Sequence, residues 1–306
     1  MSKEKSDFMK QLRLFGAFGV AIALLLNASS CIFNNDALQV NIINTDSLGV
    51  AVGEIGFISS NQIHLVDPNG TQYRQVTNTS DTKTTFKLRG NKNQAIYMSD
   101  DVSGFPRVIN FNSGGNVPNF SSTDFAFPVG FGYTAQDTFY FLTRSANRFK
   151  STSANYTAYI QQIISPHIGV GDSVKGFCIS TQNDVALSLK TASNEYKLCW
   201  IEANQAQTPK IYQDTRPITQ LFFDRNSKKL SFLTPQGVFV WSKSNTSPKI
   251  EVFDTTITHH TINPVGTEIA YTKGTNEIYV RNLTQTKFNR KISSPTNSSV
   301  SAIDWK

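Results

Sequence analysis

Short apolar runs separated by polar turns fill most of the chain. Six of these runs resemble one another, and their last residues are 40, 44, 46, 45 and 39 positions apart. They read EIGFIS (54–59), QAIYMS (94–99), TFYFLT (138–143), DVALSL (184–189), KLSFLT (229–234) and EIAYTK (268–273). Several are apolar without alternation, which is typical of strands buried on both faces. Short strands at a period of about 43 residues predict an all-β β-propeller.

Each copy predicts four strands, which we call a to d in chain order. A polar turn precedes the recurring b strand, as at residues 224–227 and 263–266. Proline and glycine in the second of these turns suit a tight reversal, because Pro presets φ and Gly tolerates positive φ. A c strand follows, such as QIHLVD (62–67) or EIYVRN (277–282), and a short outer strand completes the unit.

The two ends of the repeat region complement each other. The first copy has no inner a strand, whereas the last copy is followed by a surplus strand, SVSAIDWK (299–306). A C-terminal strand that supplies a for the first copy would join the ends and remove exposed edges. The sequence therefore predicts one domain at residues 51–306, a six-bladed β-propeller with 3+1 closure by the C-terminal strand.

Three segments resemble a known family. Residues 263–271 (NPVGTEIAY) are similar to the SPDGxxIAY core of the TolB-type, WD40-like propeller repeat. Residues 98–104 (MSDDVSG) resemble its b–c turn, and residues 67–70 (DPNG) resemble its c–d turn. The likeness extends in rhythm over about residues 50–306 and is clearest in copies one, two and six. The α/β domain that precedes the propeller of TolB has no counterpart in this sequence, so the role of TolB itself is not carried over.

The N-terminal segment has the features of a bacterial export signal. Residues 1–13 carry four basic and two acidic groups, and residues 14–26 are an apolar run. Small residues then precede Cys31, which resembles the lipobox of bacterial lipoproteins, although Ala28 and Ser30 stand where Leu and Gly or Ala are usual. The resemblance implies a signal peptide at residues 1–30, a lipidated Cys31 and a linker at residues 31–50.

Such a protein would be anchored in the bacterial cell envelope, at the periplasmic face of the outer membrane or at the cell surface. A plain secretory signal and an uncleaved signal anchor are the alternatives. The apolar run is shorter than the ~20 residues that a membrane-spanning helix needs.

Composition fits this picture. Charged residues make up only 17% of the chain, and Phe and Tyr are frequent, which suits a β protein with many turns. The formal net charge is +7. Because the basic residues are scattered, this charge indicates solubility and gives no reason to expect a nucleic-acid partner.

The cysteines predict buried thiols. Cys178 and Cys199 fall on the a and c strands of one copy, so their backbones should lie about 9–10 Å apart. A disulfide needs Cα atoms within about 7 Å. We therefore expect both thiols to be free, and we find no spacing typical of a metal site and expect no cofactor.

The titratable residues offer two weak candidates. His259 and His260 fall on the inner strand of the sixth copy and are candidate channel-lining residues, or ordinary strand residues near solvent. Propeller glycosidases use converging carboxylates, and the inner-strand acids here include Asp124, Asp224 and Asp304. Asp224 also suits a turn. Without a nucleophile motif, we predict no catalytic residue.

One loop is longer than its counterparts and carries basic and aromatic side chains, a combination found in contact sites. Its candidate partner contacts are Arg144, Arg148, Phe149, Lys150 and Tyr156, and a solvated insertion is the alternative. We therefore expect a non-catalytic envelope protein that binds a protein partner or acts as a scaffold. A carbohydrate-active enzyme, or a binder of a glycan or small ligand in the central channel, is the alternative.

Overall fold

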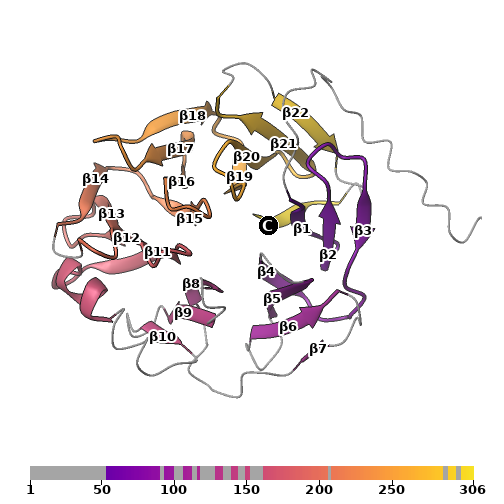
Figure 1. Cartoon of the computed structure of the whole chain (residues 1–306), viewed down its shortest axis with the longest axis horizontal. Helices are drawn as coiled ribbons and strands as arrows, with labels where there is room; N and C mark the ends of the chain where they lie inside the picture. Colours follow the sequence, from indigo (N-terminus) through magenta and orange to yellow (C-terminus); the bar gives the residue numbers. More distant parts are fainter. Residues whose placement is uncertain are drawn as a thin grey trace, which may run out of the picture. The chain divides into compact units, whose positions relative to one another are not determined.

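The described strands form a ring of antiparallel sheets (Figure 1). The structure is a computed structural model of the 306-residue chain. It describes residues 53–89, 93–99, 106–111, 116–117, 128–133, 139–143, 149–151, 161–205, 208–284, 289–293 and 298–306. All of these belong to one compact unit, Val40–Lys306. The predicted all-β β-propeller fold is confirmed.

The six sheets are numbered here in chain order of their b strands. Sheet 1 has the order β23-β1-β2-β3, and sheets 2, 4, 5 and 6 run in simple order from β4, β11, β15 and β19 outward. Sheet 3 has the order β8-β9-β10. The strands are β1 (Ile55–Ser59), β2 (Gln62–Val66), β3 (Tyr73–Gln75), β4 (Lys83–Leu88), β5 (Gln94–Ser99), β6 (Pro106–Asn110), β7 (Asn116–Val117), β8 (Pro128–Tyr133), β9 (Phe139–Thr143), β10 (Phe149–Ser151), β11 (Ser173–Ile179), β12 (Val185–Lys190), β13 (Tyr196–Ile201), β14 (Lys210–Asp214), β15 (Thr219–Phe223), β16 (Lys229–Thr234), β17 (Gly237–Ser242), β18 (Lys249–Phe253), β19 (Ile257–Ile262), β20 (Glu268–Lys273), β21 (Glu277–Asn282), β22 (Asn289–Ser293) and β23 (Val300–Trp305), with a short 3-10 helix η2 (Ser165–His167) before β11.

Six four-stranded blades were predicted. In the described part of the chain, five sheets have four strands and sheet 3 has three. All six predicted b strands are present, as β1, β5, β9, β12, β16 and β20. Sheet 3 has three strands in the described part of the chain, and residues 152–160, which follow β10, lie outside that part.

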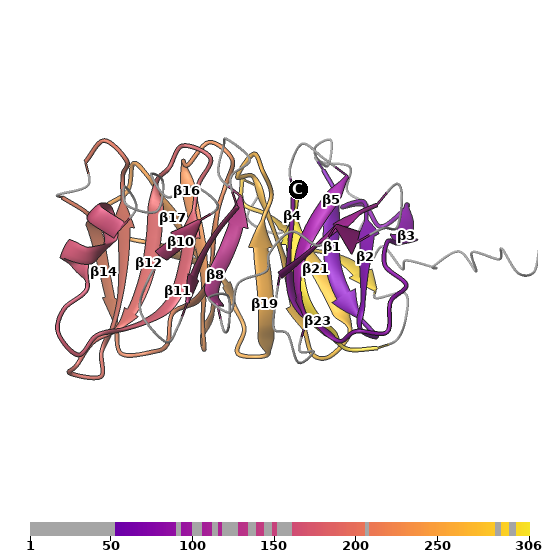
Figure 2. The ribbon, with the colours of Figure 1, turned by 90° about the horizontal axis from the view of Figure 1, so that it is seen from below.

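The innermost strands approach one another in a closed cycle. β4 contacts β8, β8 contacts β11, and the series continues through β15, β19 and β23 back to β4. β23 also pairs with β1, with Ile55 opposite Trp305 and Ile58 opposite Ala302. In side view the inner strands run roughly along the axis of the ring (Figure 2). The C-terminal strand is therefore hydrogen-bonded into the sheet of the first repeat.

The hydrophobic core lies between neighbouring sheets. One cluster joins Trp200 of sheet 4 to Trp241 of sheet 5, and their rings meet edge to face with centroids 5.9 Å apart. Another cluster joins Phe57 of sheet 1 to Ile278 and Val280 of sheet 6. Because the clusters lie between neighbouring sheets, the middle strands with described side chains are buried on both sides. This explains the apolar runs without alternation.

Candidate functional site

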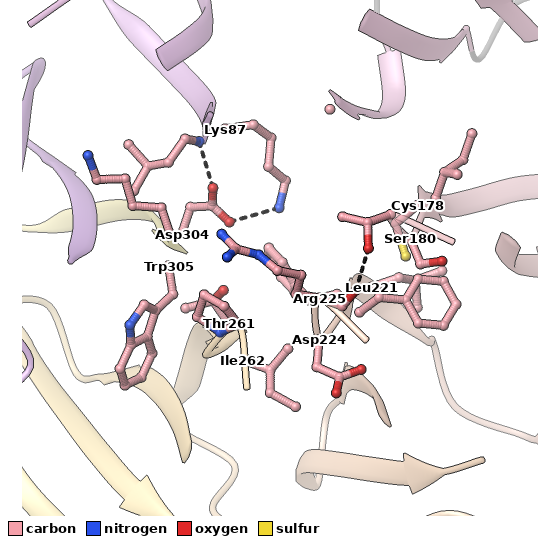
Figure 3. A pocket seen from close by; sticks show the side chains of 18 of the residues that line it. Lys87, Cys178, Ser180, Leu221, Asp224, Arg225, Thr261, Ile262, Asp304 and Trp305 are labelled. Atoms are coloured by element: carbon pink, nitrogen blue, oxygen red, sulfur yellow. Dashed lines mark hydrogen bonds and ion pairs between the residues drawn. The ribbon is translucent and has the colours of Figure 1, made fainter. Parts of the chain in front are cut away.

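The ends of the inner strands meet at one end of the ring axis and surround an open cavity of ≈ 190 Å³ (Figure 3). We call this cavity the channel mouth. Each of the six inner strands contributes lining residues, and each does so with the C-terminal part of the strand or the turn that follows. The sheet order thus brings equivalent positions of six repeats to one place.

An equivalent backbone hydrogen bond recurs at the ends of five inner strands. In five sheets the residue after the inner strand donates its N–H to a carbonyl at the start of the b strand, as Asp224 does to Lys229 (3.1 Å) and Asn263 does to Glu268 (2.9 Å). The residue before the donor is apolar in each case and lines the mouth. These residues are Leu88, Ile179, Phe223, Ile262 and Trp305.

Asp304 joins two sheets at the mouth. Its carboxylate accepts a hydrogen bond from the backbone N–H of Leu88 (2.7 Å) and pairs with the Lys87 ammonium (3.1 Å). The Lys87 ammonium also lies 3.5 Å from the centroid of the Phe222 ring, in a cation–π contact. Asp304 is 6% exposed. Its carboxylate is therefore committed to holding β23 against β4.

Asp224 holds a turn. Its carboxylate accepts the backbone N–H groups of Lys228 (2.7 Å) and Lys229 (2.9 Å), and the residue is only 2% exposed. Burial raises the pKa of this carboxyl group above its usual value, partly opposed by those hydrogen bonds. The prediction that Asp224 belongs to an a–b turn is confirmed.

Arg225 follows in the same turn and is exposed. Its backbone N–H donates to the carbonyl of Pro264 (2.8 Å), and its carbonyl accepts a hydrogen bond from the Thr181 hydroxyl. The turns of sheets 4, 5 and 6 are thus linked to one another. In Figure 3 the Arg225 side chain points toward the side of the cavity where Lys87 and Asp304 lie.

A second hollow of ≈ 300 Å³ adjoins this turn. It is lined by Glu54, Val265 and other residues, and it shares Arg225, Pro264 and Lys306 with the channel mouth. The Lys306 ammonium pairs with Glu54 (2.9 Å). The two hollows therefore adjoin at the turn that carries Arg225.

Neither His259 nor His260 is among the residues that line the channel mouth. His260 is fully buried, and its ring lies edge to face on Phe222 and is 3.2 Å from the Ser231 hydroxyl. His259 is half-buried and lies 3.3 Å from the Gln220 amide nitrogen. A register shift between Ile257 and His260 interrupts the alternation of side chains between the two faces of the sheet. The sequence pattern therefore does not predict which way these side chains point.

The cysteine prediction is confirmed. Cys178 lies on β11 and Cys199 on β13, with β12 between them, and both thiols are free and buried. They pack in different core clusters, on opposite faces of sheet 4. Burial raises the pKa of Cys178 to about 12 and that of Cys199 to about 11.

Several candidates lie outside the described residues, namely Cys31, Asp124, Arg144, Arg148 and Tyr156. Phe149 and Lys150 were expected in a loop. The structure instead places both in β10, opposite Leu142 and Phe141 of β9. The predicted contact loop is therefore interrupted by a short strand.

The sequence interpretation missed Lys87, Arg225, Trp305 and Lys306 at the mouth. A signal for them was present, because they occupy the last positions of the inner strands and the turns that follow. Aligning the repeats on the ends of their inner strands would have placed these four residues at neighbouring positions. Among the described residues, no three metal-ligating side chains group together, and no helix there is long and apolar enough to cross a membrane.

Comparisons with known proteins support the fold alone. No known family profile matches the chain, and no curated protein matches it in sequence. Among solved structures, it is similar to a chain in the crystal structure of a nidogen/laminin complex, with a TM-score of 0.62 and 12% sequence identity. The match covers 83% of this chain and 98% of the other. At this identity the similarity concerns the arrangement of the sheets.

Proposed function

We propose that the protein is a non-catalytic binding module, a lipid-anchored β-propeller of the bacterial cell envelope that docks a protein partner. The observation that carries this proposal is the state of the acids at the channel mouth. Asp304 is bonded to Leu88 and Lys87, and Asp224 is bonded to its own turn. Both carboxylates serve the fold and leave the mouth as a binding surface.

We count the six sheets as six blades of the TolB type, with sheet 3 incomplete in the described residues and with 3+1 closure through β23. The closed cycle of inner strands and the pairing of β23 with β1 support this count. The similar solved structure is a complex of two proteins by its description, which agrees with a protein partner.

Site-specific photo-cross-linking in the source cells tests the binding role and its face. A photoreactive residue is placed at Asn226, which is exposed beside the channel mouth, or at Val170, which is fully exposed near the start of β11 at the opposite end. A third position, Arg148, tests the predicted contact loop. One protein cross-linked reproducibly from one position supports the proposal and locates the face. No cross-linked protein from any of the three would contradict it.

The lipid anchor has its own test. Cells are grown with an alkyne-bearing fatty acid, and the wild-type chain is compared with the Cys31→Ala variant. We expect label on the wild type alone and release of the variant from the membrane fraction. An unlabelled wild-type chain would favour a plain secretory signal or an uncleaved anchor.

A carbohydrate-active enzyme is the second candidate, because Asp224 and Asp304 line the same cavity and burial raises the pKa of Asp224. An acid with a raised pKa is what a glycosidase needs as proton donor. Turnover of a panel of aryl glycosides by the full chain tests this. Activity that is lost in both Asp224→Asn and Asp304→Asn would overturn the non-catalytic proposal.

A further inference from the structure

We propose that the channel mouth holds a carboxylate side chain of the protein partner and that Arg225 pairs with it. This inference rests on the protein-binding function proposed above and names the chemistry of the partner. The partner would present an acidic peptide segment that also carries apolar side chains.

Arg225 differs from Lys87 and Lys306 at the mouth because no acid among the described residues pairs with it. Lys87 is paired with Asp304 (3.1 Å), and Lys306 is paired with Glu54 (2.9 Å). Within the described part of the chain, no carboxylate pairs with the Arg225 guanidinium. A guanidinium offers two parallel N–H donors that match a carboxylate, so this group is suited to an anion from outside the chain.

The backbone that carries Arg225 is fixed on both sides. Its N–H is bonded to the carbonyl of Pro264 in sheet 6, and its carbonyl is bonded to the hydroxyl of Thr181 in sheet 4. A side chain mounted on a fixed turn loses less freedom when a ligand binds than one on an unsupported loop. These contacts therefore favour a binding residue at this position.

The shape of the mouth indicates what accompanies the carboxylate. Its cavity of ≈ 190 Å³ is lined by apolar side chains such as Leu88, Ile262 and Trp305. Pockets for drug-sized ligands are about 300–1,000 Å³, so this cavity suits one side chain of a peptide better than a separate ligand. The second hollow, which shares Arg225 with the mouth, is lined by the exposed residue Val265. A peptide crossing this turn can place its acid in the mouth and an apolar neighbour against Val265.

The test uses the full chain in detergent and two labelled probe peptides of equal length, one of alternating Glu and Leu and one of alternating Gln and Leu. Binding is measured by fluorescence anisotropy for the wild type, Arg225→Gln and Arg225→Lys. Lys228→Gln is the matched control, because it removes the same charge from an exposed position of the same turn that does not line the mouth. Equal melting temperatures show that the variants fold.

We expect the Glu peptide to bind and the Gln peptide not to bind. Arg225→Gln should weaken binding of the Glu peptide by about tenfold or more, because a charged pair is lost. Lys228→Gln should have less effect. Equal losses in the two variants, or equal binding of the Gln peptide, would overturn the proposal. So would displacement by free glutarate at the same concentration as the Glu peptide, because the site would then suit a small organic acid. If the Arg225→Gln variant still forms the cross-link from Asn226, the protein-binding function stands and the proposed role of Arg225 is wrong.

Discussion

The carboxylate of Asp304 accepts a hydrogen bond from the backbone N–H of Leu88, 2.7 Å away, although the two residues are 216 positions apart in the chain. The bond joins β23 to β4, so it crosses from the sheet that contains the C-terminal strand to the next sheet of the ring. Lys87 adds an ion pair to the same carboxylate. Asp304 therefore both holds two neighbouring sheets together and lines the channel mouth.

Asp304→Ala should lower the free energy of unfolding by about 2–3 kcal/mol, because it leaves a buried N–H and a partly buried ammonium without their acceptor. Asp304→Asn keeps an acceptor for Leu88 and should cost less. Urea denaturation followed by tryptophan fluorescence measures both. Arg74→Ala, which breaks a more exposed pair with Glu54, is the control and should cost about 1 kcal/mol or less. Equal losses for Asp304→Ala and Arg74→Ala would contradict the assigned role.

Two glycines with similar backbone angles allow the cost of backbone strain to be distinguished from the cost of a packing clash. Gly266 (φ +72°) and Gly274 (φ +65°) both adopt a left-handed conformation, which costs another residue about 1–2 kcal/mol. A Cβ at Gly266 would lie 2.8 Å from the Asp224 carboxylate, whereas a Cβ at Gly274 would meet nothing within 4 Å. Gly266→Ala should therefore destabilise the fold more than Gly274→Ala in urea titrations. The reverse order would show that the turns of sheets 5 and 6 do not pack as described.

Burial of His260 should make stability depend on pH. Burial and the nearby Lys87 charge lower the pKa of His260 from 6.5 to about 3. Between these values the unfolded chain binds a proton that the folded chain does not, so stability falls as the pH falls, by about 1.4 kcal/mol per pH unit. The free energy of unfolding of His260→Leu should therefore fall less steeply below about pH 6. Parallel profiles for the variant and the wild type would refute this.

The two buried thiols should be protected in the folded protein. In a Cys31→Ser background, Ellman's reagent at about pH 8 should label neither Cys178 nor Cys199, because burial raises the pKa of both groups and blocks access. In denaturing urea both should react. Rapid labelling of one thiol in the native protein would show that sheet 4 opens locally.

The sequence was sufficient to predict the recurring b strands, because their apolar runs and turns are local signals, but it missed β10 in a segment expected to be a loop. It placed the six b strands to within one or two residues and predicted the position of β23. It did not predict the direction of side chains on the inner strands. In β19 a register shift between Ile257 and His260 turns the histidine ring toward Phe222, and a period-two pattern contains no sign of such a shift.

The site was harder to predict for a related reason. Lys87, Arg225 and Lys306 are far apart in the sequence and have no common motif. They meet because the inner strands point the same way, and only the ring geometry makes their turns neighbours. Ion pairing then distinguishes them, because Lys87 and Lys306 pair with acids and, among the residues that the structure places, Arg225 does not.

The shared direction of the inner strands has a consequence for how such a protein can acquire new partners. The turns after β11, β15 and β19 reach the same opening, while the core that stabilises their sheets lies between the sheets. A substitution in one turn can therefore change recognition without altering the folding of its repeat, and changes in different repeats can be combined independently. A laboratory library confined to these turns would sample new specificities on an unchanged framework.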